Sequence, residues 1–221
     1  MRNSPIISYT APFAIYIAFL ALHSAFVLPP RVDEVLRFGI LSLVIWLFSR
    51  RVVDFRVKSW IGSAALGFVI FVLWVLPDAL LPGYRQSVMF QNAITGKTAS
   101  SLASGAITDP LVLVLRTLRS AALVPILEEL FWRGWLMRWL IDPEFEKVPL
   151  GTYATGAFWI TAALFAAEHG PYWDVGLVAG ILFNYWMVRT RSLGDLILSH
   201  AVANLALSLY VIGAGKWEYW L

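Results

Sequence analysis

The stretch VLVLRTLRSAALVPILEELFWRGWLMRWL, residues 112–140, is apolar enough to cross a membrane, yet it carries Glu128, Glu129 and Arg133. Ionisable side chains are costly in hydrocarbon, so such residues usually mark a functional site. On a helix, Glu129 and Arg133 lie four residues apart and can form an ion pair, whereas Glu128 is rotated by about 100°. The pattern predicts one compensated carboxylate and one that is free for chemistry. A single Glu–Arg pair would more often be structural, and the doubled glutamate favours function.

The composition is that of a membrane protein. Of the 221 residues, 59% are hydrophobic and 14% are charged, whereas about a quarter are charged in an ordinary soluble domain. The mean hydropathy is +0.71. Residues 9–28, 148–167 and 196–214 contain no Asp, Glu, Lys or Arg, and each run has about the 20 residues that a membrane-crossing helix needs. These features predict a polytopic integral membrane protein.

We predict an all-α helical bundle with about seven transmembrane helices, roughly six to eight, in a single domain over residues 1–221. The predicted spans are residues 9–28, 35–49, 60–81, 112–140, 150–168, 174–189 and 194–213. Residues 82–110 are rich in Ser, Thr, Gly, Asn and Gln and indicate a long loop. That loop could gate a site, although a plain linker is the favoured interpretation.

Charge and cysteine content narrow the function classes. The net charge is +3, and basic residues concentrate in residues 50–58 and 189–191. These two connections fall on the same side if all seven spans cross, and the positive-inside rule then places them in the cytoplasm with the N-terminus. The chain has no basic run with interleaved aromatics, which argues against nucleic acid as a partner. It has no cysteine, so it has neither disulfides nor a thiolate nucleophile.

Two histidines interrupt apolar runs further along the chain. His169 is followed by a Gly-Pro dipeptide, which cannot continue a regular helix. A helix broken at membrane depth is tolerated only against protein or a water-filled cavity. His200 and Asn204 are four residues apart, share one helical face and could grip a carbonyl oxygen. Either histidine alone could instead make an ordinary interhelical hydrogen bond, and His23, on the first span, is expected to be a packing or interfacial residue.

Three motifs follow one another on three predicted helices: Glu128-Glu129-x-x-x-Arg133, Phe165-x-x-x-His169 and His200-x-x-x-Asn204. This ordered set resembles the CPBP family of intramembrane proteases, which includes the type II CAAX prenyl endopeptidases and bacteriocin-processing or self-immunity proteins. The resemblance covers residues 111–214, which we interpret as the catalytic core.

The resemblance implies an endopeptidase that cleaves a membrane-associated peptide or protein. In that mechanism Glu128 acts as general base on a water held jointly with His169, and the same pair returns the proton to the leaving amine. His200 and Asn204 would stabilise the oxyanion of the tetrahedral intermediate.

Glu129 and Arg133 would then position Glu128 and set its charge. The resemblance favours a metal-free glutamate protease. The alternative is a zinc enzyme, because Glu128, His169 and His200 supply three ligands of the kind that catalytic zinc uses with an open fourth position.

The small size and overall layout also resemble CAAX-protease-related proteins found beside bacterial exosortase sorting systems. This narrower similarity implies the bacterial inner (cytoplasmic) membrane and a link to such a sorting system. It does not name the substrate, and a prenyl group on it is not assumed.

Other classes of membrane protein remain as alternatives. The chain has no His-Glu-x-x-His, which argues against a site-2-type zinc protease, and no Gly-x-Ser-x-Gly elbow. A non-enzymatic protein could use the same polar residues in a proton-coupled carrier, an immunity factor or an inactive protease homologue. Paired discontinuous helices would favour a carrier, but the polar positions lie in one half of the chain.

Overall fold

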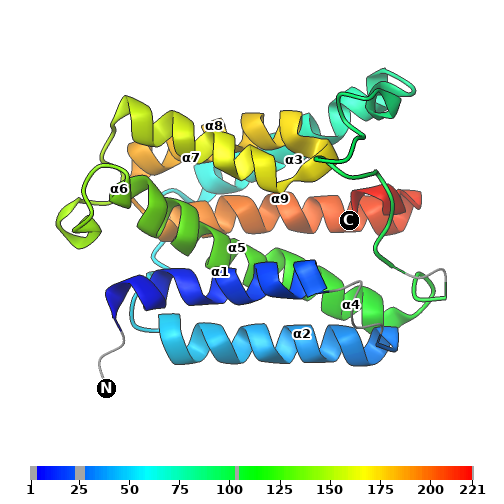
Figure 1. Ribbon diagram of the computed structural model, residues 1–221, viewed down its shortest axis with the longest axis horizontal. Coiled ribbons are helices and arrows are strands. Elements are labelled where there is room, and N and C mark those ends of the chain that lie inside the picture. Colours follow the sequence, from blue (N-terminus) through cyan, green and yellow to red (C-terminus); the bar gives the residue numbers. More distant parts are fainter. Residues whose placement is uncertain (1–3, 23–27, 103–104, 221) are drawn as a thin grey trace.

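The computed structural model describes residues 4–22, 28–102 and 105–220 and shows a bundle of helices (Figure 1). The predicted all-α fold is confirmed. In the described part of the chain, the only β-type pairing is one isolated bridge between Asn92 and Gly96. His23 lies outside the described residues.

A helix overlaps each of the seven predicted spans, and residues 23–27 of the first span lie outside the described residues. The α-helices are α1 (Pro5–Leu22), α2 (Pro30–Val44), α3 (Trp60–Leu80), α4 (Pro110–Leu118), α5 (Val124–Glu129), α6 (Met137–Trp139), α7 (Thr155–Glu168), α8 (Trp173–Thr190) and α9 (Leu193–Ala214). The π-helical segments are η1 (Ile45–Ser49), which prolongs α2, and η3 (Arg119–Leu123) and η4 (Leu130–Leu136), which join α4, α5 and α6 into one helix. The 3₁₀ turns are η2 (Tyr84–Gln86), η5 (Phe145–Lys147), η6 (Gly170–Tyr172) and η7 (Trp217–Tyr219).

Four of the described helices are long and apolar enough to cross a membrane: Pro5–Leu22, Trp60–Leu80, Pro110–Trp139 and Leu193–Ala214. Of the remaining helices, α7 has only 14 residues, and α2 carries the buried, charged Glu34 and Arg37. The bundle therefore combines long membrane-crossing helices with shorter or more polar ones that pack against them. This is the architecture of an integral membrane protein.

The fifth helix starts later than predicted. The apolar run begins near residue 148, but α7 begins at Thr155. Gly151 adopts φ +74°, in the left-handed region that favours glycine, and a side chain there would collide with the Met187 carbonyl oxygen and with Arg191. A tight turn beneath α8 thus occupies the residues that hydrophobicity alone assigns to the helix.

The helix pairs that carry the site are packed closely. α3 runs along α9, and α7 runs along α8. Gly67 of α3 lies so close to the Ser199 carbonyl oxygen of α9 that an added methyl group would overlap it. This close approach fixes α3 beside His200, the next residue of α9.

The glutamates lie where the helical repeat changes. α5 is a six-residue α-helical segment between the π-helical segments η3 and η4, and it ends on Glu128 and Glu129. Insertions of π-helix change the direction in which side chains leave the helix and frequently occur at functional sites. The local geometry therefore agrees with the polar pattern in marking this turn.

Candidate active site

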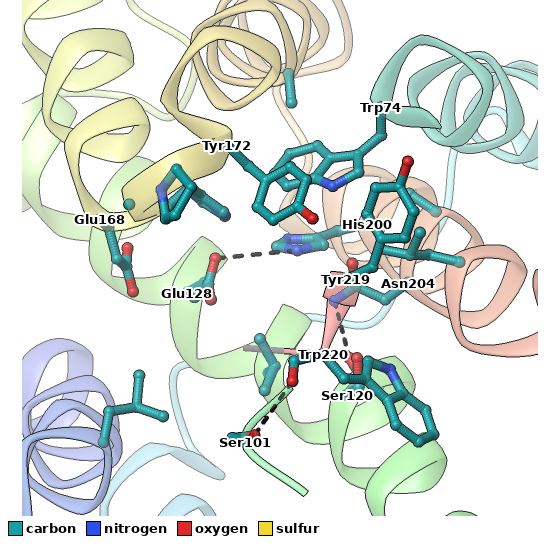
Figure 2. A pocket seen from close by; sticks show the side chains of 18 of the residues that line it. Trp74, Ser101, Ser120, Glu128, Glu168, Tyr172, His200, Asn204, Tyr219 and Trp220 are labelled. Carbon is teal, nitrogen blue, oxygen red and sulfur yellow. Dashed lines mark hydrogen bonds and ion pairs between the residues drawn. The ribbon is translucent and has the colours of Figure 1, made fainter. Parts of the chain in front are cut away.

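A cavity of about 550 Å³ lies inside the bundle (Figure 2). Its wall includes Glu128 of α5, His169 at the end of α7, and His200 and Asn204 of α9. Four residues that the sequence placed on three helices thus border one space. Glu129 and Arg133 do not line it.

Glu128 has a buried carboxyl group with spare hydrogen-bonding capacity. The residue is 4% exposed, and its Oε2 has no hydrogen-bond partner within the described part of the chain. The His200 ring is an ionisable neighbour, with its Nε2 3.9 Å from Oε2 (Figure 2). A buried oxygen of this kind is costly to leave unsatisfied, so this carboxylate is suited to hold a water molecule.

Glu129 and Arg133 form the ion pair that their spacing predicts. Both side chains are fully buried, and Arg133 Nη1 lies 3.1 Å from each carboxylate oxygen of Glu129. Arg133 also donates to the side-chain oxygen of Asn184, at 2.8 Å, and to the Gly180 carbonyl oxygen, at 3.3 Å. The pair thereby ties the continuous helix formed by α4, α5 and α6 to α8.

Glu129 also contacts a residue of another helix, His200. Its Oε1 lies 2.8 Å from His200 Nδ1, and no hydrogen bond joins Glu128 to Glu129 or Arg133 in the described structure. Since a carboxylate paired with arginine can only accept, Nδ1 carries a proton, and Nε2 is the ring nitrogen on the side of Glu128. Glu129 therefore fixes the orientation and tautomer of His200.

His169 is fixed by the break in its helix. The residue caps α7, and the chain turns at Gly170 with φ +53° before Pro171. His169 Nδ1 lies 2.7 Å from the Phe165 carbonyl oxygen, which assigns the proton to Nδ1 and leaves Nε2 as the acceptor. The predicted helix break thus presents an acceptor nitrogen at the cavity.

Asn204 lies one turn after His200 and also borders the cavity. Its amide nitrogen donates to the Ser120 carbonyl oxygen at 2.9 Å (Figure 2). Ser120 belongs to η3, so this bond links α9 to the π-helical segment before α5. One of the two amide hydrogens of Asn204 is thereby committed, and the second stays available.

The long loop is more than a linker, because Thr95, Gly96, Lys97 and Ala99 line the cavity. In Figure 1 this loop and the C-terminal segment lie at the same end of the bundle. The interpretation of residues 82–110 as a plain linker is therefore wrong.

Charged groups and the C-terminal segment close that end of the cavity. Arg119 donates two hydrogen bonds of 3.0 Å to Glu34 of α2. Arg116 donates to the Ser101 hydroxyl at 2.6 Å and lies over the Trp220 ring, 5.2 Å from its centroid. The Ser101 amide in turn donates to the Trp220 carbonyl oxygen at 2.9 Å. These contacts connect the loop, α4 and the C-terminal segment.

The C-terminal segment has a second attachment. Tyr219 donates from its hydroxyl to Asp78 at 3.1 Å. Burial and the Asp78 carboxylate raise the pKa of the Tyr219 hydroxyl, so it stays a neutral donor. Arg85 of the loop binds the same Asp78, at 2.8 Å, and also Asp174, at 2.7 Å.

Sequence reasoning left two polar residues without a role. Asn184 holds Arg133 and donates to the Phe158 carbonyl oxygen at 2.8 Å; its signal was a buried amide within an apolar run. Glu168 precedes His169 and lines the cavity beside Glu128 (Figure 2). In the sequence, Glu168 is a carboxylate that stands directly before the predicted helix break.

No three His, Cys, Asp or Glu side chains in the described residues are arranged so that they could hold a metal ion. The ring nitrogens Nδ1 of His169 and His200 are already hydrogen-bonded, which leaves one nitrogen on each ring for any other partner.

Comparison with known protein families decides the resemblance. Residues 110–206 match the family model described as type II CAAX prenyl endopeptidase Rce1-like. The predicted resemblance is confirmed. All three motifs lie within the matched segment, and the match supports a protease embedded in the membrane. No match was found among curated proteins or among solved structures.

Proposed function

We propose that the protein is an intramembrane endopeptidase that hydrolyses a peptide bond of a membrane-associated substrate, with Glu128 as general base. The observation that carries the proposal is the unpartnered, buried carboxyl oxygen of Glu128 in a cavity that it shares with His169 and His200. A structural glutamate at this depth would instead be paired, as Glu129 is.

The reaction begins with a water molecule held between Glu128 and the acceptor nitrogen of His169. Glu128 takes a proton from the water as its oxygen attacks the substrate carbonyl carbon. A positioned base of this kind typically contributes about 10²- to 10⁴-fold to the rate.

His200 and Asn204 are the proposed oxyanion donors. Asn204 has one uncommitted amide hydrogen, whereas His200 can donate from Nε2 only as the imidazolium, since Nδ1–H is directed at Glu129. The adjacent Glu129 carboxylate would stabilise that cation. Each oxyanion donor is typically worth about 3 kcal/mol.

The cavity favours a short or extended peptide segment. Its wall combines the aromatic side chains Phe71, Trp74 and Tyr172 with the polar cluster around Glu128. An apolar wall with a few convergent polar groups is typical of a ligand site. This surface suits the cleavage of a membrane-anchored peptide, with or without an attached lipid.

The charge distribution indicates how the bundle is oriented in the membrane. In Figure 1 the basic connection after η1 lies at the opposite end of the bundle from residues 82–110 and the C-terminus. With that basic end in the cytoplasm, the loop-covered cavity faces outward across a bacterial inner membrane. A substrate supplied by an exosortase-type sorting system would reach it from that side.

Comparison of membrane peptidomes tests the function directly. Cells with the wild-type protein, with Glu128→Gln and without the protein are compared, and a peptide fragment is expected only with the wild type. Such a fragment names the substrate and the bond. Identical peptidomes in all three would support a carrier, an immunity factor or an inactive homologue.

Metal removal separates the two protease mechanisms. In the proposed mechanism, exhaustive chelation leaves cleavage by the purified protein within about twofold of the untreated rate, because Glu128 and His169 activate the water. A zinc enzyme would lose activity, regain it with added metal and contain close to one equivalent of zinc by elemental analysis. Activity that follows zinc removal and return would overturn the metal-free mechanism but not the protease assignment.

A further inference from the structure

Glu168 is a second carboxylate in the same cavity. It is the last residue of α7 and lies beside Glu128 (Figure 2), close enough for electrostatic repulsion between the two groups. Glu168 Oε2 is buried and, like Glu128 Oε2, has no hydrogen-bond partner in residues 4–22, 28–102 and 105–220. No described cation lies within ion-pair distance of it.

The two histidines offer no evident proton to the leaving amine. His169 and His200 each direct the Nδ1 proton away from the cavity, toward the Phe165 carbonyl oxygen and the Glu129 carboxylate. Each ring therefore has only Nε2 left for a partner in the cavity. If His200 becomes the imidazolium, its Nε2 proton serves the oxyanion. The leaving nitrogen can take its proton from Glu128, which has gained one from water, or from a second carboxylic acid in the same cavity.

Two neighbouring carboxyl groups in a low-dielectric site cannot both ionise readily, so they tend to share one proton. Glu128 must be ionised to accept a proton from water. We propose that Glu168 is a catalytic residue, the carboxylic acid that protonates the amine leaving group. This inference rests on the proposed peptidase function and assigns it one further group.

Each proton in the proposed reaction has a donor and an acceptor. Glu128 gains a proton from water as the new C–O bond forms. The tetrahedral intermediate then collapses, the C–N bond breaks, and the Glu168 proton passes to the nitrogen. Transfer of the proton on Glu128 to the Glu168 carboxylate restores both groups, so that one water and one peptide bond become a carboxylic acid and an amine.

Leaving-group chemistry tests this role. The probes are a peptide that spans the bond found by peptidomics and its thioester analogue, whose thiolate departs without protonation. Glu168→Gln is expected to lower kcat for the peptide by about 10²-fold or more, and to leave the thioester within about threefold of wild type. Glu168→Asp keeps the acid and should recover part of the peptide activity. The exposed Glu146→Gln is the matched control.

The possible results distinguish the acid role of Glu168 from the peptidase function itself. Equal losses on both probes, or no loss on either, would overturn the acid role of Glu168 while Glu128→Gln still abolished cleavage. If the wild type and Glu128→Gln were equally inactive on both probes, the peptidase function itself would fall. Infrared difference spectra give a readout without substrate. A protonated carboxyl band at neutral pH should be present in the wild type and disappear in Glu168→Gln, and a band unchanged in Glu168→Gln would contradict the proposal.

Discussion

Glu128→Gln is expected to abolish peptide cleavage while the protein stays folded. The amide keeps the size and shape of the side chain but cannot take a proton from water, so the rate should fall by about 10⁴-fold, the upper range for a general base. Glu128 Oε2 has no hydrogen-bond partner in the described structure. The substitution therefore breaks no bond at that atom, and thermal unfolding in detergent should shift by no more than a few degrees.

Glu146→Gln is the control, since it makes the same chemical change on the surface and should leave both rate and unfolding unchanged. Full activity in Glu128→Gln would show that Glu128 is not the base. A variant that fails to fold would point to a structural role for the carboxylate instead.

The local part of this site could be predicted from the sequence. Glu129 and Arg133 are four residues apart on one helix, and the ion pair forms as that spacing requires. The break after His169 also follows from local chemistry, because Gly170 adopts a positive φ and Pro171 cannot continue the helix. Features set within one or two turns of a helix are encoded by their own residues.

The contacts between helices could not be predicted in the same way. Glu129 binds His200 at 2.8 Å, although the two residues are 71 positions apart, and this contact depends on how α9 packs against α5. The close approach of Gly67 to Ser199 and the bond from Arg133 to Asn184 have the same origin. Hydrophobic periodicity identifies helices, but it does not specify which faces meet.

Two further differences have physical causes in the backbone. The π-helical segments η3 and η4 around α5 leave no signature in apolar spacing, because one extra residue in a turn barely alters a strongly hydrophobic pattern. The loop over the cavity has the polar composition of a plain linker. Its role appears only once Arg85 binds Asp78 and Asp174 and draws the loop back over the bundle.

Glu129→Gln is expected to lower both stability and activity. Arg133 and Glu129 are both 0% exposed, and removing one member of a buried ion pair typically costs about 3–5 kcal/mol because the other charge is left uncompensated. The same change replaces the carboxylate that holds His200 Nδ1. The free energy of unfolding in detergent and kcat should therefore both fall, whereas Glu128→Gln should lower kcat alone.

A double variant separates the two effects of Glu129. In Glu129→Gln/Arg133→Met, no buried cation is left unpaired, so much of the lost unfolding free energy should return. Activity should stay low, because His200 still lacks the carboxylate that fixes its tautomer and supports its imidazolium form. Recovery of both stability and kcat would show that Glu129 only neutralises Arg133. A single Glu129→Gln variant as stable as the wild type would mean that the ion pair does not compensate a buried charge.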